Sequence, residues 1–448
     1  MLNRKIDTYL EEYYKRNNKA LLITGARQTG KSYSIRNYGT THYGSYIEIN
    51  FIDRPEAKEL FSKAKNHQDI LARLSILANK PLIKGDTLIF FDEVQEYPDI
   101  VTSIKFLVEE GSYRYIMSGS LLGVELKDLR SEPVGYMDVK EMFPLDLEEF
   151  YIALGVSQTI IDSVRSAYEQ KMPVDGFIHQ KLMEIMRLYL IVGGMPAVVQ
   201  KYIDTNNLQD VLVEQKSIVE LYKRDITKYD KNHKLYIQEI FDLIPPELNA
   251  KNKRFVLKNL NENLKFSRYE NSFIWLKEAG SALPTYNVET PTIPLKLSRS
   301  RNLFKLFQND VGLLACQYAD GIQLKLLSDE KSINFGAIYE NFIAQELHAH
   351  GFELYYFNSK KQGELDFVIE KDGAIIPIEV KSGKDYQRHN AITNVLSCNN
   401  YEINQAFVFC NDNILKKGKI YYLPIYMVSF LHRENPTPIL YRIDMTGL

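Results

Sequence analysis

Residues Leu21–Asn37 read LLITGARQTGKSYSIRN, an apolar run followed by a glycine-bounded loop and a segment that can start a helix. Gly25, Gly30, Lys31 and Ser32 have the spacing G-x-x-x-x-G-K-[ST]. In this pattern backbone N–H groups surround a phosphate, the lysine contacts the β- and γ-phosphates, and the serine hydroxyl binds Mg²⁺. The stretch therefore predicts a phosphate-binding loop between a buried parallel strand and a helix.

A second apolar run, Thr87–Gln95 (TLIFFDEVQ), leads directly into two acidic residues. Buried parallel strands end in this way at the sheet edge where ligands bind. We expect Asp92 to hold Mg²⁺ together with Ser32, and Glu93 to polarise the attacking water in phosphoryl transfer. The alternative is a charged surface turn.

A third apolar segment, Tyr113–Met117, ends in small hydroxyl residues, which predict either a sensor of the γ-phosphate or a simple turn. The predicted cofactors are ATP and Mg²⁺. The predicted nucleotide-binding residues are Gly25, Ala26, Arg27, Gln28, Thr29, Gly30, Lys31, Ser32 and Ser118.

Size and composition indicate a globular protein of several domains. The chain has 448 residues and a net charge of −2, so nucleic-acid binding would depend on a local basic patch. Its three cysteines form no C-x-x-C pair, which indicates neither a zinc site nor a disulfide framework. The apolar run Leu188–Val199 is too short for a membrane span of roughly 20 residues. We expect a cytoplasmic protein that does not contact a membrane.

The middle of the chain is basic. Residues Asn249–Lys305 contain eleven Lys or Arg and four Glu, a net charge of +7. Tyr269–Ala279 is predicted to be the DNA-facing helix of a winged-helix module, with Leu283–Leu297 as its β-wing. A solvated basic face is the alternative.

Acidic residues recur near the C-terminus in an ordered set. A predicted helix, Phe335–His350, carries Glu340, and the strands that follow it carry Asp366, then Glu379 and Lys381. Asp366 and Glu379 can together bind Mg²⁺ or Mn²⁺, while Lys381 can activate water. The alternative is a structural ion pair between Glu379 and Lys381.

Together the motifs GARQTGKS, FFDEVQ, SGS, FPLDLEEF, GGMP, GELDF and IEVKSGK resemble a bacterial and archaeal family of AAA-like P-loop ATPases with a C-terminal restriction-endonuclease-like domain. The resemblance implies a PD-(D/E)xK site in which Lys381 is catalytic and Glu340, Asp366 and Glu379 bind metal. One departure is that Gly135 and Tyr136 stand where the family often has Gly-Arg, and Arg130 is the nearest substitute arginine.

The predicted fold class is α/β, with a parallel-sheet P-loop domain at residues 1–150, a helical lid at 151–205, a winged-helix-like region at 206–309 and an α/β nuclease-like domain at 310–448. The expected function is ATP hydrolysis coupled to a DNA-binding, nuclease-like domain. The alternative is a nucleotide-controlled switch whose nuclease-like domain does not cut. DNA is the predicted partner, and self-association into an oligomer remains open.

Overall fold

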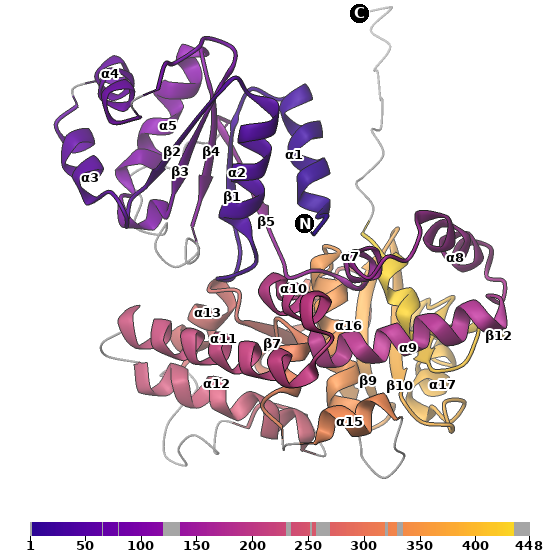
Figure 1. The fold of residues 1–448 in the computed structure, drawn as a ribbon. Coiled ribbons are helices and arrows are strands. Elements are labelled where there is room, and N and C mark those ends of the chain that lie inside the picture. Colours follow the sequence, from indigo (N-terminus) through magenta and orange to yellow (C-terminus); the bar gives the residue numbers. More distant parts are fainter. Residues whose placement is uncertain are drawn as a thin grey trace, which may run out of the picture.

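The computed structural model has two α/β bodies that meet near the phosphate-binding loop (Figure 1). In the part of the chain that is described, one body is built on a five-stranded sheet and the other on an eight-stranded sheet. The described residues are 2–64, 66–78, 80–119, 135–229, 234–250, 253–256, 269–318, 321–328 and 335–433.

The five-stranded sheet has the order β2-β3-β4-β1-β5, and all its neighbouring strands are parallel. Its strands are β1 (Ala20–Thr24), β2 (Ser45–Asn50), β3 (Thr87–Asp92), β4 (Arg114–Ser118) and β5 (Met137–Glu141). The helices of this body are α1 (Lys5–Arg16), α2 (Lys31–His42), α3 (Pro55–Ser62), α4 (His67–Ala78) and α5 (Asp99–Glu110).

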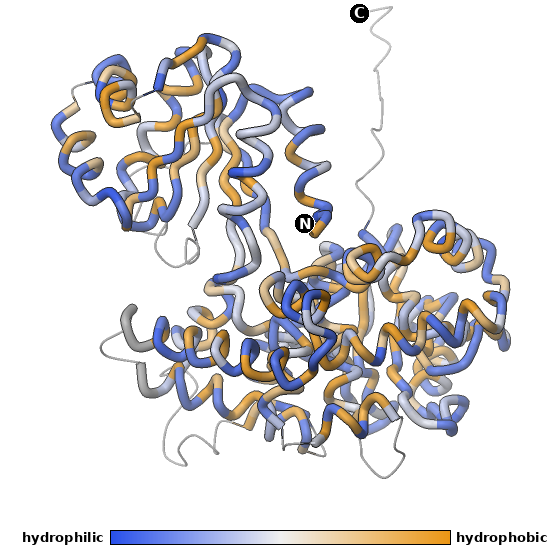
Figure 2. Tube along the Cα trace, viewed as in Figure 1, coloured by the Kyte–Doolittle hydropathy of each residue, from blue (hydrophilic) through white to orange (hydrophobic). Residues whose placement is uncertain are grey.

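Both faces of this sheet are covered, as the uninterrupted apolar strands predict. Along β1, Leu22 packs with α3, α4 and α5, whereas Leu21 and Ile23 pack with α1 and α2. The central strands are accordingly hydrophobic along their length in Figure 2. The predicted parallel P-loop sheet is confirmed, and its ligand-binding edge faces the second body.

A helical segment follows the first body and packs across the second (Figure 1). It consists of α7 (Leu147–Ala153), α8 (Gln158–Gln170), α9 (Gly176–Val192), α10 (Pro196–Thr205), α11 (Leu208–Tyr229), α12 (Lys234–Asn249) and α13 (Glu270–Glu278). As the glycines and proline predict, α9 and α10 meet at a corner of 119°. Among the described residues no single helix has the length and apolarity to cross a membrane, while this bent pair meets both criteria by length and composition alone.

The corner itself is fixed by Asp310, which begins α14 (Val311–Ala315). Asp310 accepts a hydrogen bond from the Gly194 amide at 2.6 Å. Gly193 has a φ of 72°, and a Cβ there would lie 2.2 Å from the Asp310 carboxylate. Both glycines are therefore required by close backbone approach.

The eight-stranded sheet has the order β12-β13-β11-β10-β9-β8-β6-β7 and is mixed. Its strands are β6 (Ala282–Val288), β7 (Arg299–Gln308), β8 (Tyr355–Ser359), β9 (Gly363–Lys371), β10 (Ala374–Lys381), β11 (Ala406–Cys410), β12 (Leu415–Lys417) and β13 (Ile420–Pro424). The other helices of this body are α15 (Ile322–Leu327), α16 (Gly336–Ala349) and α17 (Asn390–Leu396).

One strand pair differs from the sequence prediction. The segment expected to form a β-wing is β6, which pairs with β7 and also with β8, so both strands belong to the large sheet. The sheet thus continues across the predicted boundary between residues 309 and 310. The reason is long-range pairing: Tyr286 lies beside Tyr355, and no local pattern specifies such a partner.

Helix α16 is the central helix of the second body, with nearly all its side chains buried. Its Asn341 exchanges two hydrogen bonds with the Gln308 backbone at the end of β7, at 2.8 and 3.1 Å. Its Glu346 accepts a hydrogen bond from the Leu147 amide at 3.1 Å, at the start of α7. The helix that carries Glu340 therefore contacts both the sheet edge and the segment leaving the first body.

Candidate functional site

The phosphate-binding loop connects β1 to the N-terminus of α2, as its sequence predicts. Gly25 has a φ of 127°, and a Cβ there would lie 2.2 Å from the Met142 carbonyl oxygen. Gly30 has a φ of 93° and immediately precedes the helix. The loop therefore requires glycine at both positions, and it presents the amide end of α2, where anions are stabilised.

Lys31 folds back over this loop. Its Nζ donates hydrogen bonds to the carbonyl oxygens of Gly25 at 2.9 Å and Ala26 at 2.7 Å. Burial lowers the pKa of Lys31 to about 8, although the carboxylates of Glu93 and Asp92 oppose this shift. The ammonium thus lies inside the loop where a phosphate would be its natural partner.

Asp92 ends β3 beside the loop and is held by neutral donors. One of its oxygens accepts from Ser32 Oγ and from Asn50 Nδ2, each at 3.0 Å. The other accepts from the Glu93 amide at 3.0 Å and from Ser118 Oγ. The hydroxyl of Ser32 beside a carboxylate is an oxygen donor set that fits Mg²⁺. Asn50 was not predicted, because an amide after a strand has no distinctive sequence pattern.

Glu93 adopts a left-handed backbone conformation, with φ 55° and ψ 47°. Such a conformation is strained for a residue with a side chain, and strain of this kind concentrates at functional sites. Burial raises the pKa of Glu93, while a hydrogen bond from Gln95 opposes the shift. Glu93 is thus a half-buried carboxylate within electrostatic range of Lys31.

Arg4 also holds the loop, and the sequence analysis missed it. This side chain is 7% exposed and donates to the Thr29 carbonyl oxygen at 3.0 Å, to Glu149 at 3.1 Å and to the Phe143 carbonyl oxygen at 2.7 Å. It therefore ties the loop to the FPLDLEEF segment. A single arginine before the first helix carries no motif by which it could have been found.

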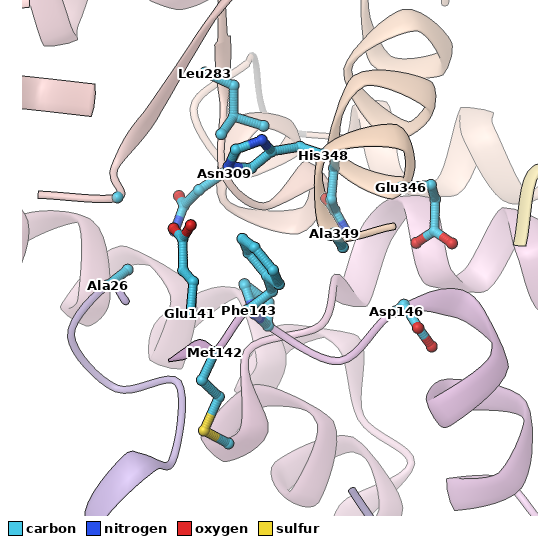
Figure 3. Close-up of a pocket in the computed structure, with 13 residues that line it drawn as sticks. Ala26, Glu141, Met142, Phe143, Asp146, Leu283, Asn309, Glu346, His348 and Ala349 are labelled. Carbon is cyan, nitrogen blue, oxygen red and sulfur yellow. The ribbon is translucent and has the colours of Figure 1, made fainter. Parts of the chain in front are cut away.

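The first body meets the second around a small cavity of about 20 Å³ (Figure 3). The loop contributes Ala26, the end of β5 contributes Glu141, and α16 contributes His348. Phe143 and His348 pack edge to face with ring centroids 5.2 Å apart. Burial raises the pKa of Glu141 and lowers that of His348 to about 4. The phosphate-binding loop and the helix that bears Glu340 thus line the same pocket.

The C-terminal acidic residues do gather on neighbouring elements, but lysines lie among them. Lys305 on β7 is completely buried, with its Nζ 2.8 Å from Glu364 and 3.7 Å from Glu340. The other oxygen of Glu340 pairs with Lys253. Burial alone would lower the pKa of Lys305, but Glu340, Asp366 and Glu364 together raise it. Sequence reasoning did not predict Lys305 or Glu364 in this cluster.

Glu379 and Lys381 lie on the same face of β10 and form an ion pair at 2.7 Å. Burial raises the pKa of Glu379 to about 8, and the negative charge of Asp366 adds to the shift. Asp366 accepts a hydrogen bond from the Val380 amide at 2.8 Å. Among the residues that the structure describes, no hydrogen-bond donor reaches one buried carboxylate oxygen of Glu379 and one of Glu340.

The metal prediction for this cluster stays a prediction, and the lysines around the carboxylates bear on it. Across the described ranges, no three His, Cys, Asp or Glu side chains are placed to hold one metal ion. Three carboxylates are near enough to influence one another electrostatically: Glu340, Asp366 and Glu379. Lys253 and Lys305 neutralise Glu340, and Lys381 neutralises Glu379. Lysines thus pair with two of the three carboxylates that the prediction assigns to the metal.

The basic middle segment is also different from the prediction. Lys253 and Lys305 point into the acidic cluster, and Arg254 lies 3.9 Å from Glu364. Lys305, being fully buried, does not belong to any surface. Part of the positive charge therefore balances the cluster, while Arg301 remains exposed. Lys251 and Arg130 lie outside the described residues.

Family models match three parts of the chain. Residues 17–151 match the model of an AAA domain. Residues 183–325 and 335–428 match two domains of unknown function, DUF8612 and DUF4143. No curated protein matches the sequence. The AAA match and the geometry of the loop together identify a P-loop ATPase-like domain at the N-terminus.

Several solved structures resemble the chain distantly. The Walker-type ATPase PABY2304 of Pyrococcus abyssi is 14% identical over 71% of this chain and 96% of that chain, with a TM-score of 0.43. The ORC1 protein of Aeropyrum pernix, solved in complex with DNA, is 11% identical over 74% and 93%, with a TM-score of 0.30. AMPPCP-bound DnaA of Aquifex aeolicus is 14% identical over 60% and 86%, also with a TM-score of 0.30.

Proposed function

We propose that this protein binds and hydrolyses ATP, with Mg²⁺ as cofactor, and that nucleotide state is transmitted to the second body. One observation carries the proposal: Lys31 and Asp92 both lie at the loop within electrostatic range of each other, and the hydrogen-bond partners given for each are neutral groups. A buried cation and a buried carboxylate that lack counter-charges in direct contact are suited to a charged ligand.

The roles of the individual groups follow from their positions. Lys31 would exchange two carbonyl oxygens for phosphate oxygens, and Ser32 with Asp92 would hold Mg²⁺, which neutralises charge on the phosphates. Glu93 would orient the attacking water, and Ser118, already hydrogen-bonded to Asp92, would report on the γ-phosphate. Arg4 keeps the loop in place through the Thr29 carbonyl.

The test is phosphate release from ATP by the purified full-length protein, with Mg²⁺ and with EDTA. We expect slow turnover that requires Mg²⁺. A protein that neither binds nor hydrolyses ATP under these conditions would contradict the proposal.

For the C-terminal body, two functions remain proposals. One is a DNA-binding, PD-(D/E)xK nuclease-like site in which Asp366 and Glu379 bind Mg²⁺ or Mn²⁺ and Lys381 assists water attack. The other is a nucleotide-controlled module that does not cut. The lysine-neutralised carboxylates favour the second, because a metal ion would have to displace Lys253 from Glu340.

DNA cleavage in Mn²⁺ separates these two functions. The intact protein is compared with Asp366→Ala and Lys381→Ala, with and without ATP. Absence of cleavage by the intact protein supports the non-cutting module. Cleavage that both substitutions abolish would establish the nuclease, whereas equal cleavage by all three proteins would indicate contamination.

A further inference from the structure

Arg27 of the phosphate-binding loop is bound from the second body. Its Nη1 lies 2.5 Å from Asp225 Oδ1, and Asp225 is a 5% exposed residue of α11. The carbonyl oxygen of Arg27 accepts a hydrogen bond from Tyr222 at 3.1 Å. Tyr222 and Asp225 are three residues apart and so lie on one face of the helix. Backbone and side chain of Arg27 are both bound by α11.

The charge of Arg27 is also felt at the proposed catalytic groups. Burial lowers the pKa of Lys31, and the positive charge of Arg27 lowers it further. Burial raises the pKa of Glu93, whereas the positive charge of Arg27 opposes this shift. Arg27, Trp275 and Ser281 line a small cavity of about 20 Å³. Arg27 therefore borders a small cavity and lies within electrostatic range of Lys31 and Glu93.

Two cations of the loop thus have protein oxygens as partners. Lys31 is bound to the carbonyl oxygens of Gly25 and Ala26, and Arg27 is bound to Asp225. Phosphate oxygens are strong competitors for both cations, and a guanidinium matches them in planar, two-pronged geometry. A nucleotide in this loop would compete with Asp225 for Arg27.

We propose that Arg27 exchanges Asp225 for the nucleotide phosphates, so that the Arg27–Asp225 pair stabilises the nucleotide-free arrangement of the two bodies. The inference rests on the proposed ATP binding. The Arg27–Asp225 pair and the bound nucleotide exclude each other, so ATP binding loosens α11 from the loop. For the same reason, a substitution that weakens the pair strengthens ATP binding. This exchange is how nucleotide state would reach the second body.

A double-mutant cycle on the full-length protein tests the exchange, using the dissociation constant of a fluorescent ATP analogue in Mg²⁺. Arg27→Gln should weaken binding about tenfold, the effect expected when a charge-assisted hydrogen bond is lost. Asp225→Asn should tighten binding about fivefold, since a partly buried ion pair no longer opposes it. In the Arg27→Gln background, Asp225→Asn should have no effect.

The matched control is Asp242→Asn on α12. This substitution removes an ion pair with Lys223 at 2.9 Å, and Lys223 lies on α11 two positions before Asp225. This control should bind the analogue as the unmodified protein does. Two results would overturn the inference alone. In the first, the unmodified protein binds the analogue but Asp225→Asn does not bind it more tightly. In the second, Asp225→Asn tightens binding equally in the Arg27→Gln background. Absence of binding by the unmodified protein overturns the proposed function as well.

Hydrogen exchange gives a second readout that needs no substitution. In the unmodified protein, amides of α11 around Tyr222 and Asp225 should exchange faster when ATP and Mg²⁺ are present. Unchanged or slower exchange there, with ATP bound, would overturn the inference.

Discussion

The phosphate-binding loop and the C-terminal acidic cluster both bury lysines together with carboxylates, but their charges are balanced differently. At the loop, Lys31 is bound by carbonyl oxygens and Asp92 by hydroxyl and amide groups. In the cluster, Glu340 and Glu364 are paired directly with lysines. A buried charge with neutral partners is stabilised when a ligand of opposite charge binds. A buried ion pair must be broken before either of its groups can bind such a ligand, and breaking it is costly. The first arrangement suits ligand binding, and the second suits structure.

The largest effect is expected when a lysine is removed from the C-terminal acidic cluster, and it is an effect on the stability of the fold. Lys305→Met should lower the free energy of unfolding by about 3–5 kcal/mol, because it removes the fully buried cation that lies between Glu340 and Glu364. Urea unfolding measures this change. Adding Glu340→Gln should recover part of the loss, and the exposed control Lys296→Met should change stability by less than about 0.5 kcal/mol. A small effect of Lys305→Met would mean that water reaches the cluster.

Next in size is the effect of Glu93→Gln on turnover. The amide cannot polarise water as a carboxylate does, so kcat should fall roughly 1,000-fold while ATP still binds. Phosphate release and analogue binding are measured together. Glu96→Gln, three residues along the chain, is the control and should retain turnover. Undiminished hydrolysis by Glu93→Gln would remove this residue from the catalytic role.

Lys31→Ala should weaken ATP binding about 100-fold, because the phosphates lose a charged donor for two hydrogen bonds. Calorimetric titration with ATP and Mg²⁺ measures the loss. Lys15→Ala, an exposed residue of α1, should bind ATP normally. Equal affinity of Lys31→Ala and the unmodified protein would show that the nucleotide does not occupy this loop.

The smallest expected effect is a dependence of ATP affinity on pH. In the free protein the pKa of Lys31 is about 8, and phosphate favours the charged form, so binding raises this pKa. Affinity is then fully present below pH 8 and falls as pH rises above it, by about tenfold between pH 7 and 9. Lys31→Arg keeps its charge throughout this range and should give a flatter profile. An equally steep profile for Lys31→Arg would assign the titration to another group.

Much of the first body was predictable because its signals are local. The strands ending in Thr24, Asp92 and Ser118 and the helix beginning at Lys31 all lie where the sequence predicts them. The spacing of the loop residues is itself the geometry of the site, since adjacent residues are held within a few ångström by the chain. The C-terminal helix and three strands were predicted for the same reason.

The sequence by itself determined the phosphate-binding loop, the acidic end of β3 and the order of Glu340, Asp366, Glu379 and Lys381 along their elements. Tertiary structure alone decided that β6 and β7 join the large sheet, that Lys305 lies buried among those carboxylates, and that Asp225 binds Arg27. Short-range geometry follows from the peptide chain, whereas a pair such as Arg27 and Asp225, 198 residues apart, forms only when packing brings two bodies together.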